Sequence, residues 1–340
     1  MAPWGRPLAT VFAAGLRAQG AEVLVVSTGS HYEAVGSEED VVLVTGSTKQ
    51  LASWGSLVSA LRVARQFRPD VVITEELADP RLLPVLRLAP VAVLVHDDAP
   101  HDETEMQPWH RRAISKRVAQ QADLLVTFSE FVARHARSRW NTPVITVPLP
   151  SEAPQTLVPP LVTASDRSDM VMLGRINPYK DAPTTLAAWA IHVGSPSYRG
   201  DELIIIGDGN ETVLELPTHC SWLRERFQFA DVLPTLARAK ASVVHYRSAT
   251  QSGVQVTSMQ CGTAAVISDA GGLPEYLPPG GHSVPVGDAV QLATAFDDLA
   301  DPTRAATAGA AARVQYDSFF TQEIAAGALL AQLRRWLLTR

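Results

Sequence analysis

The stretch DMVMLGRINPYKD (residues 169–181) carries the pattern on which the predicted fold depends. Four apolar residues, 170–173, read as a buried strand that ends at Gly174. Arg175 follows at once, and Lys180 comes after an Asn-Pro turn, just ahead of a helix-like run. Glycine lets backbone approach a ligand closely, and free helix N–H groups with two cations suit a pyrophosphate. The stretch therefore predicts a phosphate-binding turn. The alternative is an ordinary strand–helix turn with two solvated cations.

Length, charge and cysteine usage limit the class of protein. The chain has 340 residues, which at about 100–200 residues per domain predicts two domains. Its 29 basic and 35 acidic residues give a net charge of −6, which argues against a nucleic-acid binder held by a general basic field. Cys220 and Cys261 supply neither a disulfide framework nor a metal-ligand cluster, so we expect both to be buried.

The sequence also bears on location. No apolar run approaches the roughly 20 residues of a membrane span. Residues 8–19 read as an amphipathic helix and not as the apolar region of a signal peptide. We therefore expect a cytoplasmic protein. The arginine-rich segments 111–117 and 134–139 could attract anionic lipid headgroups at the inner face of the membrane, with a solvated helix face as the alternative.

The N-terminal half alternates helices with continuous apolar strands, which predicts a parallel sheet covered on both faces. Helices are expected at 7–19, 58–67, 109–121 and 129–137, and strands at 22–27, 41–45, 70–74, 91–95, 123–128 and 144–147. A doubly wound domain usually opens with its central strand and a glycine-rich loop. This chain begins in the helix that would follow that strand. We therefore expect the first strand to be missing from the sequence.

The C-terminal half repeats the alternation after a proline-rich stretch, 148–169, which reads as an interdomain linker. Strands are expected at 169–173, 202–206, 241–246 and 264–268, and helices at 182–193, 231–239, 254–261, 289–299, 302–316 and 322–338. Two α/β lobes place the expected site in the cleft between them, near the carboxyl ends of the strands.

Glycines follow one predicted strand after another in this half. They are Gly174, Gly207, Gly209, Gly253, Gly271 and Gly272. One such glycine is a weak signal, but several at strand ends put flexible backbone and free N–H groups around one cavity. The segment ATQSGV (249–254) precedes a predicted helix and is typical of an anion-binding N-terminus, with Ser252 as a candidate cap.

These motifs, in this order, resemble the retaining nucleotide-sugar glycosyltransferases of family 4. The matching pieces are GRINPYKD, IIGDG and YRSATQSGVQVTSMQCGTAAVISDAGGLPEYL, and the resemblance covers 169–316. VLVHDD and ADLLVTFS extend it more loosely into the first half. It implies the α/β GT-B fold, with two Rossmann-like doubly wound lobes facing a central cleft. Residues 1–150 would be the acceptor-side lobe and 151–321 the donor lobe, with helix 322–340 packing back on the first lobe.

The resemblance also implies roles for residues. Arg175 and Lys180 would hold the donor diphosphate and stabilise the charge that grows on it, so that neither a metal nor a cofactor is needed. His96 would face the donor sugar across the cleft. Further donor contacts would come from Gly174, Gly207, Gly209, Phe229 with its neighbours Gln228 and Ala230, Gln251, Ser252, Gly253, Val254 and Glu275.

The sequence departs from the family at one point. Many members carry two glutamates with seven residues between them, where this chain has Ala249 and Thr257. Contacts to the donor hydroxyls would then come from Gln251, Ser252 and Thr257. The resemblance implies transfer of a sugar from a UDP- or GDP-sugar to a hydroxyl of a glycan, glycolipid or small molecule (an EC 2.4 reaction). The acceptor would attack the face that the phosphate leaves, with no need for a glycosidase-like carboxylate pair.

Alternatives remain at several residues. From the residues alone, His96 is a satisfied structural histidine, and only the resemblance makes it a site residue. Asp97 and Asp98 read as a solvated turn more readily than as metal ligands. Glu75 is a candidate acceptor contact. Among whole-protein alternatives, a dinucleotide-dependent oxidoreductase lacks its G-x-G-x-x-G fingerprint, and a non-catalytic scaffold of the same fold would account for the missing glutamates.

Overall fold

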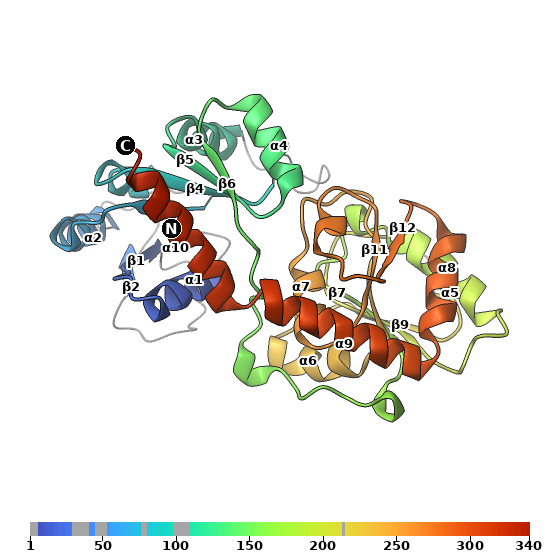
Figure 1. Ribbon diagram of the computed structural model, residues 1–340. Coiled ribbons are helices and arrows are strands. Elements are labelled where there is room, and N and C mark those ends of the chain that lie inside the picture. Colours follow the sequence, from blue (N-terminus) through green and yellow to red (C-terminus); the bar gives the residue numbers. More distant parts are fainter. Residues whose placement is uncertain (1–5, 29–40, 45–52, 76–79, 98–108, 213–214) are drawn as a thin grey trace. The chain divides into compact units, whose positions relative to one another are not determined.

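The computed structural model describes the chain apart from residues 1–5, 29–40, 45–52, 76–79, 98–108 and 213–214. Its residues divide into two compact units (Figure 1). The first holds the chain up to Asp98, then Met106–Pro150 and Gln322–Arg340, and the second holds Ser151–Thr321. We describe each unit by itself.

The first unit contains parallel strands in two ladders, β1-β2 and β3-β4-β5-β6. The strands are β1 (Val25–Thr28), β2 (Val41–Val44), β3 (Val72–Thr74), β4 (Val91–Val95), β5 (Leu124–Thr127) and β6 (Val144–Thr146). The helices are α1 (Arg6–Ala18), α2 (Ser53–Phe67), α3 (Trp109–Gln120), α4 (Glu130–Arg139) and α10 (Gln322–Leu337). Within the described residues no strand pairs with both ladders. The expectation of a missing first strand stays a prediction.

Helix α10 packs against α1 in this unit. Leu8, Phe12 and Leu16 form the buried face of α1, at the spacing of one side of a helix. The two helices meet at Gly15, where an added Cβ would lie 2.5 Å from the Cβ of Ala326. A glycine at this crossing lets the two backbones approach closely.

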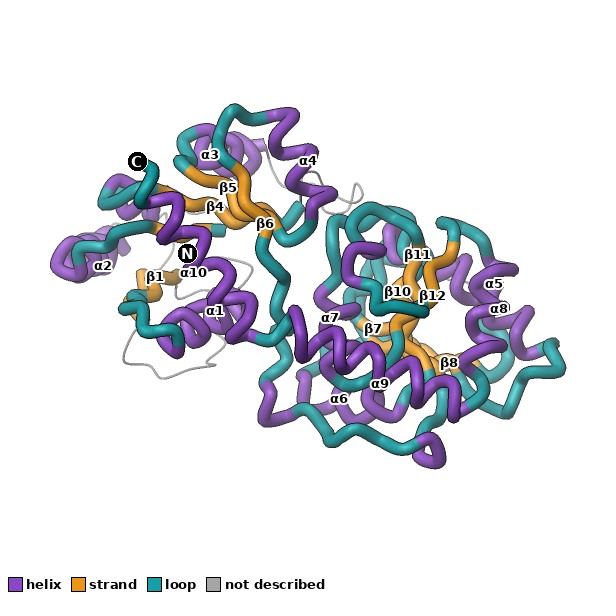
Figure 2. The backbone as a smooth tube through the Cα atoms, viewed as in Figure 1, coloured by secondary structure: helices purple, strands orange, loops and turns teal. Residues whose placement is uncertain are grey.

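The second unit is one parallel sheet in the order β12-β11-β10-β7-β8-β9. Its strands are β7 (Met170–Leu173), β8 (Leu203–Ile206), β9 (Cys220–Leu223), β10 (Ala241–Val244), β11 (Ala265–Ser268) and β12 (His282–Val284). Its helices are α5 (Ala182–Val193), α6 (Phe229–Arg238), α7 (Gly253–Gln260), α8 (Ala289–Leu299) and α9 (Pro302–Phe319). Figure 2 shows the strands as a central layer between helices, which is the α/β architecture that the sequence predicts.

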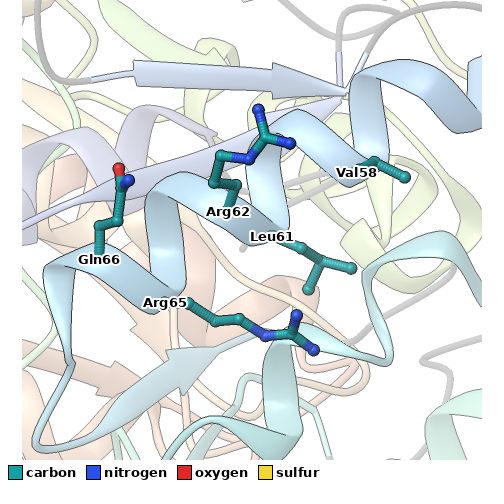
Figure 3. A pocket seen from close by; sticks show the side chains of 5 residues that line it. All are labelled: Val58, Leu61, Arg62, Arg65 and Gln66. Atoms are coloured by element: carbon teal, nitrogen blue, oxygen red, sulfur yellow. The ribbon is translucent and has the colours of Figure 1, made fainter.

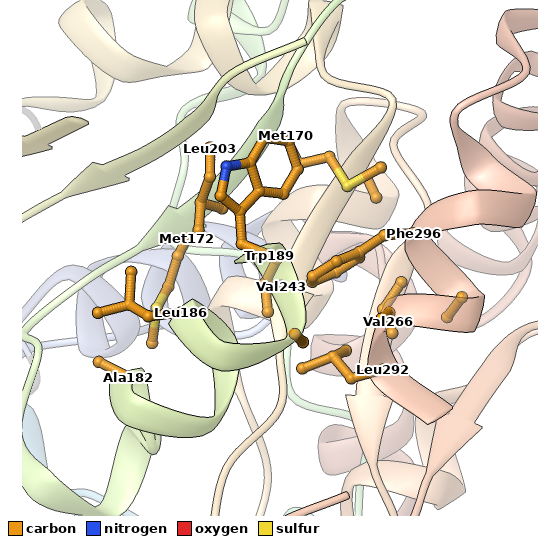
Figure 4. Close-up of a cluster of buried hydrophobic side chains, with 14 of the residues drawn as sticks. Met170, Met172, Ala182, Leu186, Trp189, Leu203, Val243, Val266, Leu292 and Phe296 are labelled. Carbon is orange, nitrogen blue, oxygen red and sulfur yellow. The ribbon is translucent and has the colours of Figure 1, made fainter. Parts of the chain in front are cut away.

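Alternate residues of the central strand β7 face opposite helical layers. Met170 and Met172 pack with side chains of α5 and α8, around the fully buried Trp189 (Figure 4). Val171 and Leu173 pack with residues of α6 on the other face. The indole Nε1 of Trp189 donates to the His219 carbonyl at 2.9 Å, which satisfies its polar atom inside the core. This double burial explains why the strand reads as a continuous apolar run.

Several boundaries differ from the sequence predictions. The short edge strands β9 and β12 went unpredicted, because CSWL and HSV carry little of the apolar pattern that marks a buried strand. Helix α2 starts at Ser53, not at residue 58. The predicted linker is wrong for its second part, since residues from Ser151 belong to the second unit. There Ala153 is buried in the core against α6.

No helix in the described part of the chain combines the length and the apolar character that a membrane span requires.

The α1–α10 crossing can be tested by a single methyl group. Gly15→Ala is expected to lower the free energy of unfolding by about 1–3 kcal/mol, because the new Cβ overlaps Ala326 and neither helix backbone can yield freely. The measurement is the urea midpoint followed by circular dichroism.

Gly55→Ala is the matched control. Gly55 lies in helix α2 with no atom within 4 Å of an added Cβ, so alanine should raise stability by up to about 1 kcal/mol. Equal midpoints for the two variants would show that α1 and α10 are not closely packed.

Candidate active site

The carboxyl ends of β7 and β10 form the switch point of the second sheet. From β7 the chain adds β8 and then β9 on one side, whereas β10, β11 and β12 extend the other side. In open α/β sheets, ligands bind in the crevice at such a point. Residues 174–181 leave β7 at this edge of the sheet, and helix α7 begins in the connection that follows β10.

Gly174 is the point at which three elements meet. Its φ of +108° lies in the region that L side chains rarely adopt. A Cβ on Gly174 would lie 2.6 Å from Nζ of Lys180 and 3.5 Å from Cγ2 of Val254, at the start of α7. The end of the strand, the lysine ammonium and the helix N-terminus therefore converge where Gly174 has no side chain.

Two further predicted glycines are required by close packing of backbone. Gly207 has φ +139° and Gly209 has φ +149°. A Cβ at the first would overlap the Gly174 carbonyl, and a Cβ at the second would overlap the backbone of Ile176. The loops after β7 and β8 thus interlock. This packing accounts for both glycines, and their expected place in a nucleotide pocket stays a prediction.

Lys180 is a buried cation that has only neutral partners. Its side chain belongs to the short helix η8 (Pro178–Lys180), and the residue is 4% exposed. Nζ donates to the carbonyl of Leu173 at 2.8 Å and to the hydroxyl of Tyr246 at 3.0 Å, and it lies 4.7 Å from the Tyr246 ring centroid. No described carboxylate forms an ion pair with it. Because an unpaired buried charge is costly, this arrangement favours binding of an anion.

Arg175 is placed differently from Lys180. Its side chain is exposed, between the half-buried Gly174 and the buried Ile176, and its guanidinium forms no hydrogen bond or ion pair with the described residues. A second cation thus follows the same strand end, and no described residue would have to be displaced from it by a ligand.

The N-terminus of α7 has the expected cap. The Ser252 hydroxyl accepts a hydrogen bond from the backbone N–H of Gln255 at 3.2 Å, which confirms Ser252 as the N-cap. At Gly253 an added Cβ would meet no atom within 4 Å. The fold itself therefore does not require glycine there, and the helix start is left open to a ligand. Gln251 and Val254 on either side are half-buried.

The positions of the two absent glutamates are both buried. Ala249 is 4% exposed, and the Thr257 hydroxyl lies 3.1 Å from that of Ser151. Thr257 therefore holds the chain where it enters the second unit, and neither position offers a carboxylate.

The remaining predicted donor contacts lie on two helices. Phe229 and Ala230 form the first turn of α6, with Gln228 as the N-cap, so the helix predicted at 231–239 begins two residues earlier than expected. The Phe229 ring packs in part against the core beneath α6. Glu275 is exposed on the short helix η9 (Leu273–Tyr276).

His96 follows β4 in the first unit and has a carboxylate neighbour. Its Nε2 lies 3.6 Å from Oε1 of Glu75, which follows the adjacent parallel strand β3 and is 4% exposed. Its ring lies 5.0 Å from that of Phe128, at the end of β5. The two atoms lie beyond hydrogen-bond distance, so Glu75 is a carboxylate neighbour of His96, a relation that sequence reasoning missed because only strand pairing brings the two residues together.

Other groups fall outside this edge. The described residues contain no cluster of three or more His, Cys, Asp or Glu side chains placed to hold a metal. Burial raises the pKa of the Cys220 and Cys261 thiols to about 12, with Glu202 adding to the effect at Cys220, so both stay protonated at neutral pH. Cys261 is buried as expected, whereas Cys220 is half-buried. A hollow of about 440 Å³ lies on α2, far along the chain from every predicted site residue. It is lined by Val58, Leu61, Arg62, Arg65 and Gln66 (Figure 3).

Comparisons with known proteins agree with this architecture. Residues 167–301 match the family model "Glycosyl transferases group 1", and residues 8–150 match the "Glycosyl transferase 4-like domain". A sucrose-phosphate synthase of Thermosynechococcus elongatus is 19% identical with a TM-score of 0.70, and the match covers 96% of this chain and 92% of that one. No curated protein matches the chain.

Two further structures are similar at low identity. HepE of Anabaena, solved with UDP and glucose, is 15% identical with a TM-score of 0.69, and the match covers 98% of this chain and 96% of that one. A trehalose-6-phosphate synthase is 12% identical with a TM-score of 0.64, with 98% of each chain covered. At these identities the likeness shows the fold alone.

The two α/β units and the matched models define a glycosyltransferase of the GT-B fold. Within that class the chain belongs to the family 4 type, as its motifs indicate. The oxidoreductase alternative is thereby excluded.

Gly174→Ala tests the convergence of elements at the switch point. Because alanine is strained at φ +108° and its Cβ would displace Nζ of Lys180, the variant is expected to lose turnover by about 100-fold or more. Initial rates of sugar transfer and a thermal melt measure activity and folding separately.

Gly194→Ala serves as control. It follows α5 with an ordinary φ of −80°, and its added Cβ would lie no closer than 3.5 Å to another atom. A Gly174→Ala enzyme as active as this control would remove Gly174 from the site.

Proposed function

We propose that this glycosyltransferase moves a sugar from a nucleotide-diphosphate sugar to a hydroxyl group of a glycan, glycolipid or small molecule. The observation that carries the proposal is the buried Lys180 ammonium, which lies beside Gly174 at the switch point without a carboxylate partner. A diphosphate would supply the missing negative charge. The HepE structures with UDP and with UDP-glucose support a UDP-sugar as the first donor to try, with a GDP-sugar as the alternative.

The proposed reaction retains the configuration at the anomeric carbon. The bond between that carbon and the phosphate oxygen breaks, and its electron pair stays on the phosphate. The acceptor oxygen bonds to the anomeric carbon on the same face, and its proton passes to the departing phosphate. Lys180 and Arg175 would stabilise the charge that grows on this leaving group. The similar trehalose-6-phosphate synthase, an enzyme described as transferring a glycosyl group with retention, supports this stereochemistry.

We also propose that the enzyme needs neither a metal nor a cofactor, and that it acts in the cytoplasm. The two cations would take the charge-neutralising role that a divalent ion plays elsewhere. His96 is proposed to meet the donor sugar. The proposal also includes contact with the inner face of a membrane. Two arginines of the segment 134–139 already have partners within the protein, since Arg137 on α4 pairs with Glu130 and Arg139 lies over the Trp140 ring.

A donor panel tests the proposed function. Purified protein is incubated with UDP-, GDP- and ADP-sugars with and without EDTA, and nucleotide diphosphate release and thermal shift are followed. At least one donor should bind and turn over, and EDTA should leave the rate unchanged. Absence of binding by every nucleotide would refute the proposal. Binding without turnover on any acceptor would instead favour a non-catalytic scaffold of this fold.

Arg175→Ala tests the leaving-group role. The side chain is exposed and unpaired within the described chain, so the fold should survive while kcat falls by about 100-fold or more. Arg238→Ala is the matched control, since Arg238 is an exposed arginine at the end of α6, beside the amino end of the same sheet. If both variants keep full activity, Arg175 does not act on the leaving group.

A further inference from the structure

The exit of β10 holds the turn that carries Lys180. The three residues that follow the strand, His245, Tyr246 and Arg247, each approach that turn. The backbone N–H of Arg247 donates to the Tyr179 carbonyl at 2.7 Å, and its Nη2 lies 2.7 Å from Oδ1 of Asp181. Nδ1 of His245 lies 4.0 Å from the other carboxylate oxygen of Asp181. Two neighbouring strands of the switch point are thus tied together beyond their backbone ladder.

Tyr246 contributes the contact to Lys180 itself. Its hydroxyl accepts a hydrogen bond from Nζ, and the same ammonium lies over its ring. An ammonium has three N–H donors, and the Leu173 carbonyl takes a second. Among the described residues nothing accepts from the third donor, which is therefore the one that a ligand would take, in a direction set by the first two contacts.

Tyr246 is itself firmly held. It is 3% exposed, and its backbone N–H and carbonyl both bond to the Ser268 hydroxyl, at 3.1 and 2.6 Å. The Tyr179 ring packs edge-on against it at 5.7 Å. A residue anchored from both sides is able to fix the end of a flexible four-carbon side chain.

Tyr246 can contribute by fixing the flexible side chain of Lys180 before a ligand binds, because fixing it costs conformational entropy. A lysine loses rotamer entropy when its ammonium group is fixed in one position. Here that cost is met during folding. The ammonium therefore needs no reorganisation when charge develops on a leaving group, which is the condition for effective electrostatic stabilisation.

We propose that Tyr246 is a positioning residue, which orients the Lys180 ammonium toward the leaving diphosphate. The inference rests on the proposed function and gives a role to a residue that opens the family piece YRSATQ (246–251) but is not among the implied donor contacts. Asp181 and Arg247 support it, because their ion pair holds the residue after Lys180 in a left-handed conformation, φ 53°. Tyr246 acts through Lys180 and not on the substrate.

Tyr246→Phe tests the proposal because it removes the acceptor oxygen and keeps the ring. With the donor sugar that the panel identifies, kcat is expected to fall about tenfold while KM for the donor changes less than about threefold. The reason is that the leaving phosphate carries more negative charge in the transition state, and in free UDP, than in the intact donor. Tyr198→Phe is the matched control. The Tyr198 hydroxyl donates to the backbone carbonyl of Asp201 at 2.9 Å and belongs to the layer around Trp189, away from Lys180. Its kcat should stay at the wild-type value.

A double-mutant cycle separates positioning from structure. UDP affinity is measured by calorimetry for Lys180→Met, Tyr246→Phe and the double variant, so that no turnover is needed. If Tyr246 acts through Lys180, its substitution has no further effect once the ammonium is gone. Equal losses in both backgrounds, or a Tyr246→Phe enzyme that behaves as Tyr198→Phe does, would overturn the inference.

Two further outcomes distinguish failure of the proposed function from failure of this inference. A wild-type protein that binds no nucleotide refutes the proposed function and this inference with it. A normal wild type with an unaffected Tyr246→Phe variant refutes the inference alone. Should thermal melts show that Tyr246→Phe does not fold, Arg247→Ala takes its place in the cycle. Its side chain is half exposed, and its loss should lower kcat about threefold through the same lysine. Additivity with Lys180→Met would again count against the proposal.

Discussion

A buried ammonium with no carboxylate partner among the described residues is the constraint on which the second unit depends. Nζ of Lys180 donates hydrogen bonds to the Leu173 carbonyl and to the Tyr246 hydroxyl, which offset part of the cost of burying an ammonium. This arrangement needs Gly174, because any side chain at that position would occupy the space of Nζ. It also needs β7 beside β10, since one strand supplies the carbonyl and the other the tyrosine. The strand order of the sheet therefore brings both hydrogen-bond acceptors to the ammonium group of Lys180.

Much of this could be read from the sequence, for physical reasons. Strand β7 is buried on both faces, so it appears as the apolar run MVML, and helix α5 follows it with matching bounds. The cap at Ser252 was predictable because the side chain competes locally for a backbone N–H. Short edge strands such as β12 were not predicted, because few of their residues enter the core.

Contacts between strands account for what sequence reasoning missed at the site. Tyr246 meets Lys180 over 66 positions of the chain, and Glu75 meets His96 through the pairing of β3 with β4. Neither contact can be recognised from a sequence motif. The pairing of neighbouring strands brings the two residues together, and their spacing along the chain does not. Thr257 is a third case. Its position suggested a donor contact, yet its hydroxyl bonds to Ser151, which lies 106 residues earlier. A signal for Tyr246 did exist, as an aromatic residue at the exit of a buried strand.

The interlocked glycines have a consequence for motion. Because Gly207 lies against the Gly174 carbonyl and Gly209 against Ile176, the loops after β7 and β8 cannot open separately. A hinge in either loop would have to break contacts that leave no room for even one methyl group. Local adjustment at this edge of the sheet therefore falls to exposed side chains such as Arg175, while the interlocked backbone of the two loops moves as one piece.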